Sequence, residues 1–245
     1  MKNSELCRAD NRWGKTMNAN NFIQTIDELK DLLRQNGQFE TNTRPTSQVE
    51  ILKETALCCE LLYFEDFTFQ EGSIAGDIYV TKIKDIFSQP KRKKYHPLNH
   101  PGPSVFNVNF KISECTGNEG IYSHKTQTIT VHPDFNDFIT LMHEMIHAYD
   151  DQMTHAQAEI LTIMLYNKLK CKIKNLDLVL LAWAQYDNQK MLEQNGEIAH
   201  EVLFLLKSLD LELRLELPVG TISGFFSKRK DTLQAPMGKI KIERL

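Results

Sequence analysis

Two histidines and a glutamate fall within five residues of each other, as His143-Glu144-Met145-Ile146-His147. Residues four apart share one face of a helix, so both imidazoles can reach one metal ion. The glutamate is turned aside from the two ligands, where it can hold a water molecule at the metal and take its proton. The spacing therefore predicts a catalytic zinc site, with Zn2+ held by His143 and His147 and with Glu144 as the general base.

A catalytic zinc needs a third protein ligand and keeps one position for water. Glu159 is the favoured candidate, because an acid within a mostly apolar helical run is costly unless it faces water or a cation. His155 lies one helical turn earlier on the same face and is the alternative. Either choice requires the chain to reverse over residues 151–154, since a straight helix would carry Glu159 away from His147. Candidates further along the chain are Glu193, Glu197 and His200.

The motif lies in a predicted helix that Asp134 opens as N-cap. The apolar residues of this helix recur at spacings of three and four and form one stripe: Phe135, Phe138, Ile139, Met142, Ile146 and Tyr149. At about 100° per residue, the two histidines fall on the edge of that stripe and Glu144 beyond it. The pattern thus predicts histidines at the border between core and cleft, with Tyr149 in the core.

Period-two alternation predicts strands over residues 106–110 and 126–131, separated by a glycine-containing turn near 117–120. In the second strand, Ile129 and Val131 share one face. Helical spacing predicts helices over about 22–33 and 49–64, the latter with an apolar side made of Ile51, Leu52, Ala56, Cys59 and Leu62. Residues 134–208 read as helical, with breaks near 153–154 and 175.

The predicted fold class is α+β and zincin-like, with a small antiparallel or mixed sheet packed on the active helix and a helical C-terminal subdomain. The domain prediction has three parts: a polar N-terminal segment with one helix and a linker over 1–47, a metallopeptidase domain over 48–220, and a tail over 221–245. Residues 209–217 alternate like a strand but use helix-favouring leucine and glutamate, and the tail is assigned a short strand near its end.

Composition sets the broad class of the protein. The 245 residues carry a net charge of −3, and hydrophobic residues make up 41%, which is typical of a globular chain. No apolar run is long enough for a membrane span, and no signal peptide is evident, which predicts an intracellular, cytoplasmic protein. A secreted effector acting in a host cytosol is the alternative. Five cysteines without a C-x-x-C pair predict neither a disulfide framework nor a cysteine zinc finger.

The basic run Lys91–Lys94 stands beside Tyr95 in a proline-rich loop and could contact phosphate groups. A solvated loop is favoured, because the charge elsewhere is negative. The expected partner is therefore a protein or peptide substrate. Nucleic acid is a less favoured partner, and the oligomeric state stays open.

Residues 143–151, HEMIHAYDD, resemble the active helix of the mitochondrial ATP-synthase processing peptidase family. Residues 155–160, HAQAEI, are similar to that family's next segment, and this resemblance favours Glu159 as ligand. The same helix is also similar to SprT-like metalloproteases, including the Spartan group, which cleave proteins crosslinked to DNA. That second resemblance favours His155. The two resemblances together cover only residues 115–159. The cysteine-rich pattern of the first family and the C-terminal zinc finger of the second are missing.

Together these patterns predict a zinc-dependent endopeptidase that acts on an intracellular protein. An extended substrate is expected to pair with the strand over 126–131 by β-augmentation. His155 is the expected oxyanion stabiliser if it is not the third ligand. The alternatives are a DNA-associated protease and a non-catalytic zinc-containing binding protein.

Overall fold

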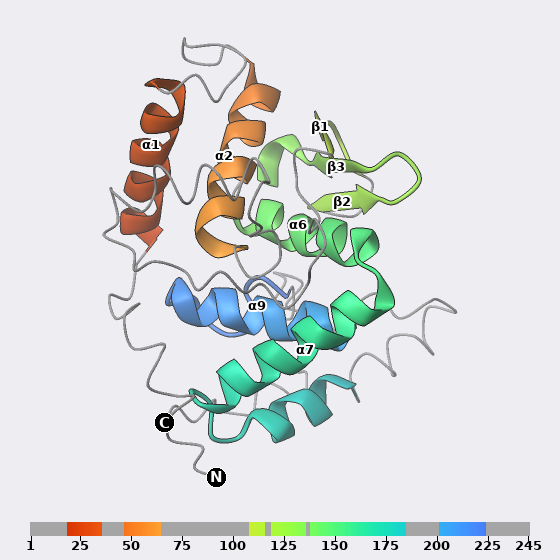
Figure 1. Cartoon of the computed structure of the whole chain (residues 1–245). Coiled ribbons are helices and arrows are strands. Elements are labelled where there is room, and N and C mark those ends of the chain that lie inside the picture. The colour runs from red at the N-terminus through yellow and green to blue at the C-terminus, as the bar shows by residue number, and fades with distance from the viewer. Residues whose placement is uncertain are drawn as a thin grey trace. The chain divides into compact units, whose positions relative to one another are not determined.

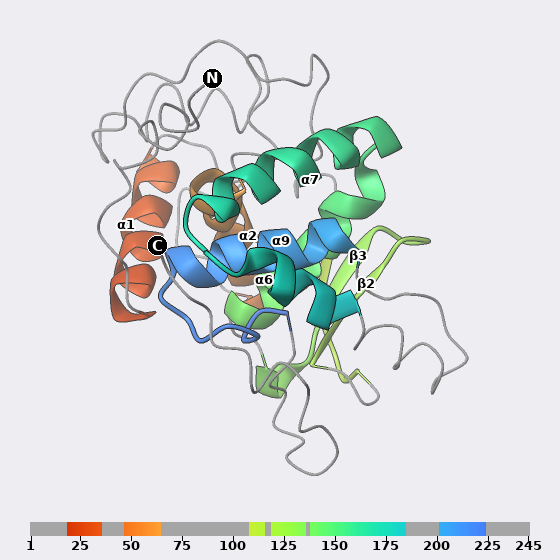
Figure 2. The same cartoon turned by 90° about the horizontal axis from the view of Figure 1, so that it is seen from below.

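The computed structural model of the chain describes residues 19–35, 47–64, 108–115, 119–135, 138–184 and 201–223. Figures 1 and 2 show its helices and strands in two views. The chain divides into two compact units, one formed by residues 20–158 and the other by residues 1–19 with 159–245. The predicted metallopeptidase domain over 48–220 stays a prediction.

Two helices begin the first unit, as predicted: α1 (Ala19–Gln35) and α2 (Gln48–Tyr63). They lie side by side in both views (Figures 1 and 2). The Arg34 guanidinium of α1 donates to both carboxylate oxygens of Glu54 on α2, which joins the two helices. A capping box of Ser47 and Glu50 starts α2, because each side chain accepts a hydrogen bond from the other's backbone N–H.

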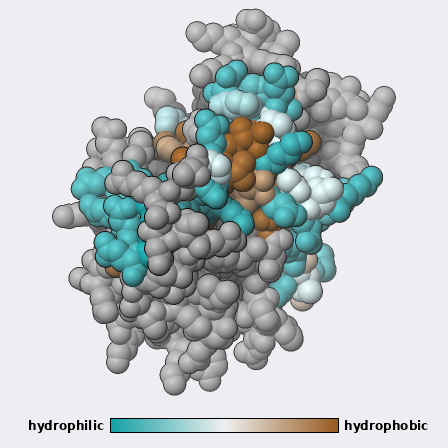
Figure 3. Space-filling model, turned by 90° about the horizontal axis from the view of Figure 1, so that it is seen from above, coloured by the Kyte–Doolittle hydropathy of each residue, from teal (hydrophilic) through white to brown (hydrophobic). Residues whose placement is uncertain are grey.

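The C-terminal half of α2 is buried on all sides, including the thiols of Cys58 and Cys59. The predicted apolar side is confirmed for Leu52, Ala56, Cys59 and Leu62. It is wrong for Ile51, which is 43% exposed because the first turn of α2 projects beyond the packed region. Other apolar residues also reach the surface, and Figure 3 shows hydrophobic residues bordered by hydrophilic ones on the face it presents.

Three short strands form a mixed sheet: β1 (Asn109–Ile112), β2 (Gly120–Ser123) and β3 (Thr128–Val131). Their order is β1-β3-β2, with β1 parallel and β2 antiparallel to β3. The predicted mixed sheet is therefore confirmed. The expectation that the strand over 126–131 offers a free edge is wrong, because β3 is hydrogen-bonded on both sides.

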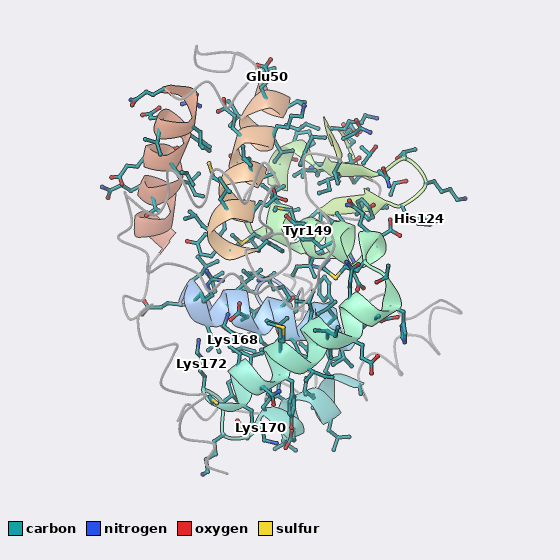
Figure 4. The ribbon with its side chains drawn as sticks, in the orientation of Figure 1. Glu50, His124, Tyr149, Lys168, Lys170 and Lys172 are labelled. Carbon is teal, nitrogen blue, oxygen red and sulfur yellow. The ribbon has the colours of Figure 1, made fainter. Side chains whose placement is uncertain are left out.

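The sequence pattern located β3 better than its neighbours. Ile129 and Val131 are buried on one face, as predicted. The strand predicted over 106–110 begins instead at Asn109, and residues 106 and 107 lie outside the described part. Gly120, which the pattern assigns to a turn, is the first residue of β2. The actual turn spans 124–127, with His124 at its start (Figure 4) and Gln127 in the left-handed region at φ 46°.

Helix α6 (Phe138–Gln152) carries the histidine motif and packs against β2, β3 and α2. Asp134 does not cap it. Residues Pro133–Phe135 form a 3₁₀ turn, and the Asp134 N–H donates to Nδ1 of His132 at 3.2 Å, so Asp134 lies one turn before the helix. The predicted apolar stripe is confirmed at its centre, where Met142, Ile146 and Tyr149 are buried.

The second unit contains most of α7 (His155–Lys170), a helix over 176–184, and α9 (Val202–Arg214). The predicted breaks near 153–154 and 175 are confirmed. Residues 209–214 belong to α9 rather than to a strand. Nearly every residue of this helix is buried, and an apolar sequence that is buried on all sides does not show the helical period of hydrophobic residues.

Cysteine usage differs in one respect from the expectation. Cys171 is disulfide-bonded, and its partner lies outside the described residues. Within the described part of the chain, no helix is long and apolar enough to cross a bilayer. The basic run Lys91–Lys94 and the predicted strand near the C-terminus also lie outside the described residues.

Candidate metal centre

The imidazoles of His143 and His147 converge on one point beside α6. Their Nε2 atoms are 3.3 Å apart, and the rings meet edge to face with centroids 5.0 Å apart. Two nitrogens bound at the usual zinc distance to one tetrahedral ion would lie about 3.3 Å apart. The helix therefore presents the two ring nitrogens at the separation that two ligands of one zinc ion require.

The electrostatic setting keeps His147 neutral. Burial, and then the neighbouring His143, lower its pKa from 6.5 to about 3. Both rings are only partly exposed. A neutral imidazole carries the lone pair that a metal ligand needs, so the donor pair fits the chemistry of zinc.

Glu144 is buried, with 4% of its surface exposed. The expectation that it lies beyond the packed stripe is therefore wrong, because the sheet covers this face of α6 as well. Its carboxylate accepts a hydrogen bond from the backbone N–H of Tyr122 on β2. Burial raises its pKa from 4.5 to about 8, and the Tyr122 N–H opposes that rise. The group that would take a proton is thus shielded from bulk water and held by one backbone donor.

Gly120 permits this close packing between β2 and α6. A Cβ at position 120 would lie 2.8 Å from Cγ2 of Thr140, 3.0 Å from Cγ of Glu144 and 3.1 Å from its Oε1. Real Cβ atoms essentially never lie 2.8 Å from another heavy atom, so with any larger residue here the Thr140 side chain or the strand would have to shift, and Glu144 would have to give way slightly. The glycine is required here for the space it leaves.

A second contact joins the same strand to the far end of the helix. The Tyr122 hydroxyl donates to Oδ2 of Asp151 at 2.8 Å. Burial, and then the Asp151 carboxylate, raise the pKa of Tyr122 well above its ordinary value. Asp151 lies one helical turn beyond His147 on the face that carries both histidines. The strand is therefore tied to α6 on both sides of His147.

The third ligand stays a prediction. Glu159 and His155 are both exposed, and Glu159 belongs to the second unit, whereas His143 and His147 belong to the first. Among the residues that the structure describes, no group of three or more His, Cys, Asp or Glu side chains could hold a metal ion. The further candidates Glu193, Glu197 and His200 lie outside the described residues.

Sequence reasoning missed Gly120 and Tyr122, the strand residues that contact Glu144. The only local signal was the Ile121-Tyr122 pair, a β-branched residue followed by an aromatic one, just before a polar turn. Four residues are too few to show a period of two, so the pattern could not indicate β2 or its approach to the helix.

Comparison with known proteins identifies no relative, since no protein-family model, no curated protein and no solved structure matches the chain. The resemblance of the active helix to two peptidase families is therefore carried by the motif residues alone.

Proposed function

We propose that the chain is a zinc-dependent endopeptidase that hydrolyses peptide bonds of an intracellular protein substrate. In this proposal His143 and His147 hold Zn2+, and Glu144 is the general base. The observation that carries it is the 3.3 Å separation of the two Nε2 atoms, which suits two ligands of one tetrahedral ion. The lowered pKa of His147 supports it, because the ring is neutral at physiological pH.

A bound zinc and the Glu144 carboxylate would have separate roles in the reaction. A bound zinc would act as a Lewis acid toward water and the scissile carbonyl. With a bound zinc to favour the ionised form of its carboxylate, Glu144 would accept a proton from the attacking water and return it to the leaving amine. The same Nε2 separation also suits an N–H···N hydrogen bond between two neutral imidazoles. Metal content, rather than geometry, therefore decides the proposal.

The proposed position of an extended substrate is the outer edge of β2. Among the described strands, β3 has neighbours on both sides, while β2 has one and packs against α6. A peptide that adds to a sheet edge gains main-chain hydrogen bonds irrespective of its sequence. Pairing with β2 would bring its backbone next to the helix that carries the histidines.

We keep Glu159 as the proposed third ligand and His155 as the alternative. Both residues are exposed, so replacing either by alanine removes a ligand without opening the core. Loss of the true ligand should weaken zinc binding by about 10-fold to 100-fold or more. The variant that retains wild-type affinity identifies the residue that is not a ligand.

The decisive experiment compares zinc content and cleavage of a mixed protein substrate in wild type, His147→Ala and Glu144→Ala. We expect one zinc per chain in wild type, its loss in His147→Ala, and retained zinc without cleavage in Glu144→Ala. His124→Ala is the matched control, because it removes an exposed histidine of the turn over 124–127, outside the motif. Absence of zinc after metal is added back would contradict the site. Stoichiometric zinc without any cleavage would favour a non-catalytic zinc protein.

A further inference from the structure

The backbone N–H and C=O groups of Tyr122 point away from β3, the strand that pairs with β2. The N–H of His132 donates to the Glu119 carbonyl at 2.9 Å, so residues 119, 121 and 123 form the hydrogen-bonded pairs with β3. Residues 120 and 122 are the alternate, non-hydrogen-bonded positions. Their N–H and C=O groups therefore point outward from β2, and the Tyr122 N–H cannot bond to β3.

Glu144 is the acceptor of that outward N–H. Its carboxylate reaches the strand because Gly120, two residues away on the same face, has no side chain to block it. The Tyr122 ring extends along α6 to Asp151 and fixes the strand against the helix at a second point. These three contacts hold one backbone donor opposite the carboxylate next in sequence to His143.

We propose that Gly120 and Tyr122 are positioning residues for the Glu144 carboxylate. This inference rests on the proposed peptidase function, since it explains how the general base is aimed. A backbone donor held in place by the strand restricts the rotamers of the carboxylate that accepts from it. The outer edge of β2 thereby holds the base through the Tyr122 N–H, so a substrate at this edge would pair with the other outward main-chain groups of the strand.

The contact is tested by amide hydrogen exchange on chelated, zinc-free protein. The Tyr122 amide should exchange about tenfold or more faster in Glu144→Ala than in wild type, because its acceptor is gone. Glu144→Gln keeps a carbonyl acceptor and should retain part of the protection. The Ile121 amide bonds to β3 and serves as the internal control, with equal exchange in all three proteins. Equal exchange of Tyr122 in wild type and Glu144→Ala would overturn the inference.

The positioning role is tested by comparing two variants that both lack the tyrosine ring. Tyr122→Ala keeps the backbone N–H, whereas Tyr122→Pro removes it, and proline is tolerated where a strand N–H points outward. With zinc bound, Tyr122→Pro should have a kcat about 10-fold to 100-fold below that of Tyr122→Ala, with similar KM and equal zinc content.

Equal kcat in the two ring-less variants, or a higher kcat in Tyr122→Pro, would overturn the positioning role. The exchange result separates this failure from failure of the proposed function. If Tyr122 is protected by Glu144 but the zinc-loaded wild type cleaves nothing, the contact exists, the peptidase proposal is wrong, and the positioning role falls with it. If wild type cleaves and Tyr122 is not protected, only the positioning role is wrong.

Discussion

The hydroxyl of Tyr149 on α6 donates a hydrogen bond to Oε1 of Glu60 on α2 at 2.9 Å, with both side chains fully buried. The ring centroids of Phe64 and Tyr149 (labelled in Figure 4) lie 4.7 Å apart, so the Phe64 ring packs against the tyrosine. Because Tyr149 follows His147 by two residues, this bond fixes the half of α6 that carries the second candidate ligand. The core of the first unit thus sets the orientation of the histidine pair.

Tyr149→Phe should destabilise the protein by about 1–3 kcal/mol, because it removes a donor from a buried carboxylate without changing the packed volume. The free energy of unfolding in urea measures the change. Tyr166→Phe is the matched control, since its hydroxyl donates to the exposed Asp177 and its loss should change stability much less. Equal destabilisation by the two variants would show that the Glu60 contact contributes nothing specific.

Glu212 at the end of α9 predicts a dependence of stability on pH. Its buried carboxylate accepts backbone N–H groups of Gly220, Ile222 and Ser223 at 2.9, 2.8 and 3.2 Å. Burial nevertheless raises its pKa from 4.5 to about 7. Because the folded state binds the proton more tightly, this stability is fully present below about 4.5 and is lost as pH rises to about 7. The change is on the order of 3 kcal/mol.

Urea unfolding at several pH values between 4 and 8, in wild type and Glu212→Gln, measures this dependence. Glutamine keeps an oxygen that can accept from the turn over 220–223 but does not ionise, so the variant should lose this part of the pH dependence. Parallel curves for the two proteins would mean that Glu212 titrates as it does in the unfolded chain.

Asp210 of α9 belongs to a buried cluster of charged side chains, and its replacement should lower the free energy of unfolding more than Tyr149→Phe does. Asp210, which is 1% exposed, lies 3.0 Å from Nζ of Lys168, 3.7 Å from Nζ of the fully buried Lys207 and 3.6 Å from Arg214. Asp210→Ala should cost about 3–5 kcal/mol, because it leaves a buried ammonium without this counter-charge. Lys168→Ala should cost less, since 20% of the Lys168 side chain (labelled in Figure 4) is exposed to solvent. Equal urea midpoints for the two variants would contradict this ranking.

What the sequence could predict was local. A spacing of four within one helix places His143 and His147 together whatever the rest of the chain does, and the two Nε2 atoms do meet. Helical spacing likewise predicted the helix over about 22–33, which corresponds to α1 and buries Leu29 and Leu33. The third ligand could not be predicted in the same way, because its position depends on the path of the chain after α6.

Contacts between elements were not predictable from periodicity. A single apolar stripe assumes that one face of α6 is covered, whereas α2 packs on one side and the sheet on another. Glu144 is buried for that reason, and the approach of β2 depends on a missing side chain at Gly120. A glycine read in isolation indicates a turn, and only the three-dimensional packing reveals that its role is to leave space.

The buried Glu144 carboxylate should lower the stability of the zinc-free protein, although the proposed activity requires it. Since burial raises the Glu144 pKa from 4.5 to about 8, the folded zinc-free chain should lose stability as pH rises through that interval. Glu144→Gln removes the ionisable group, so it should raise the urea midpoint of the zinc-free protein at pH 8 while abolishing cleavage by the zinc-loaded one. Gln152→Ala is the control, because it replaces a part-buried amide near the end of α6. Gln157→Glu would not serve as a control, because the Gln157 side chain accepts a hydrogen bond from the Thr154 N–H at the start of α7. If Glu144→Gln lowers the zinc-free midpoint at pH 8, the carboxylate stabilises the fold at that pH, and the predicted cost of ionising it in the core is wrong.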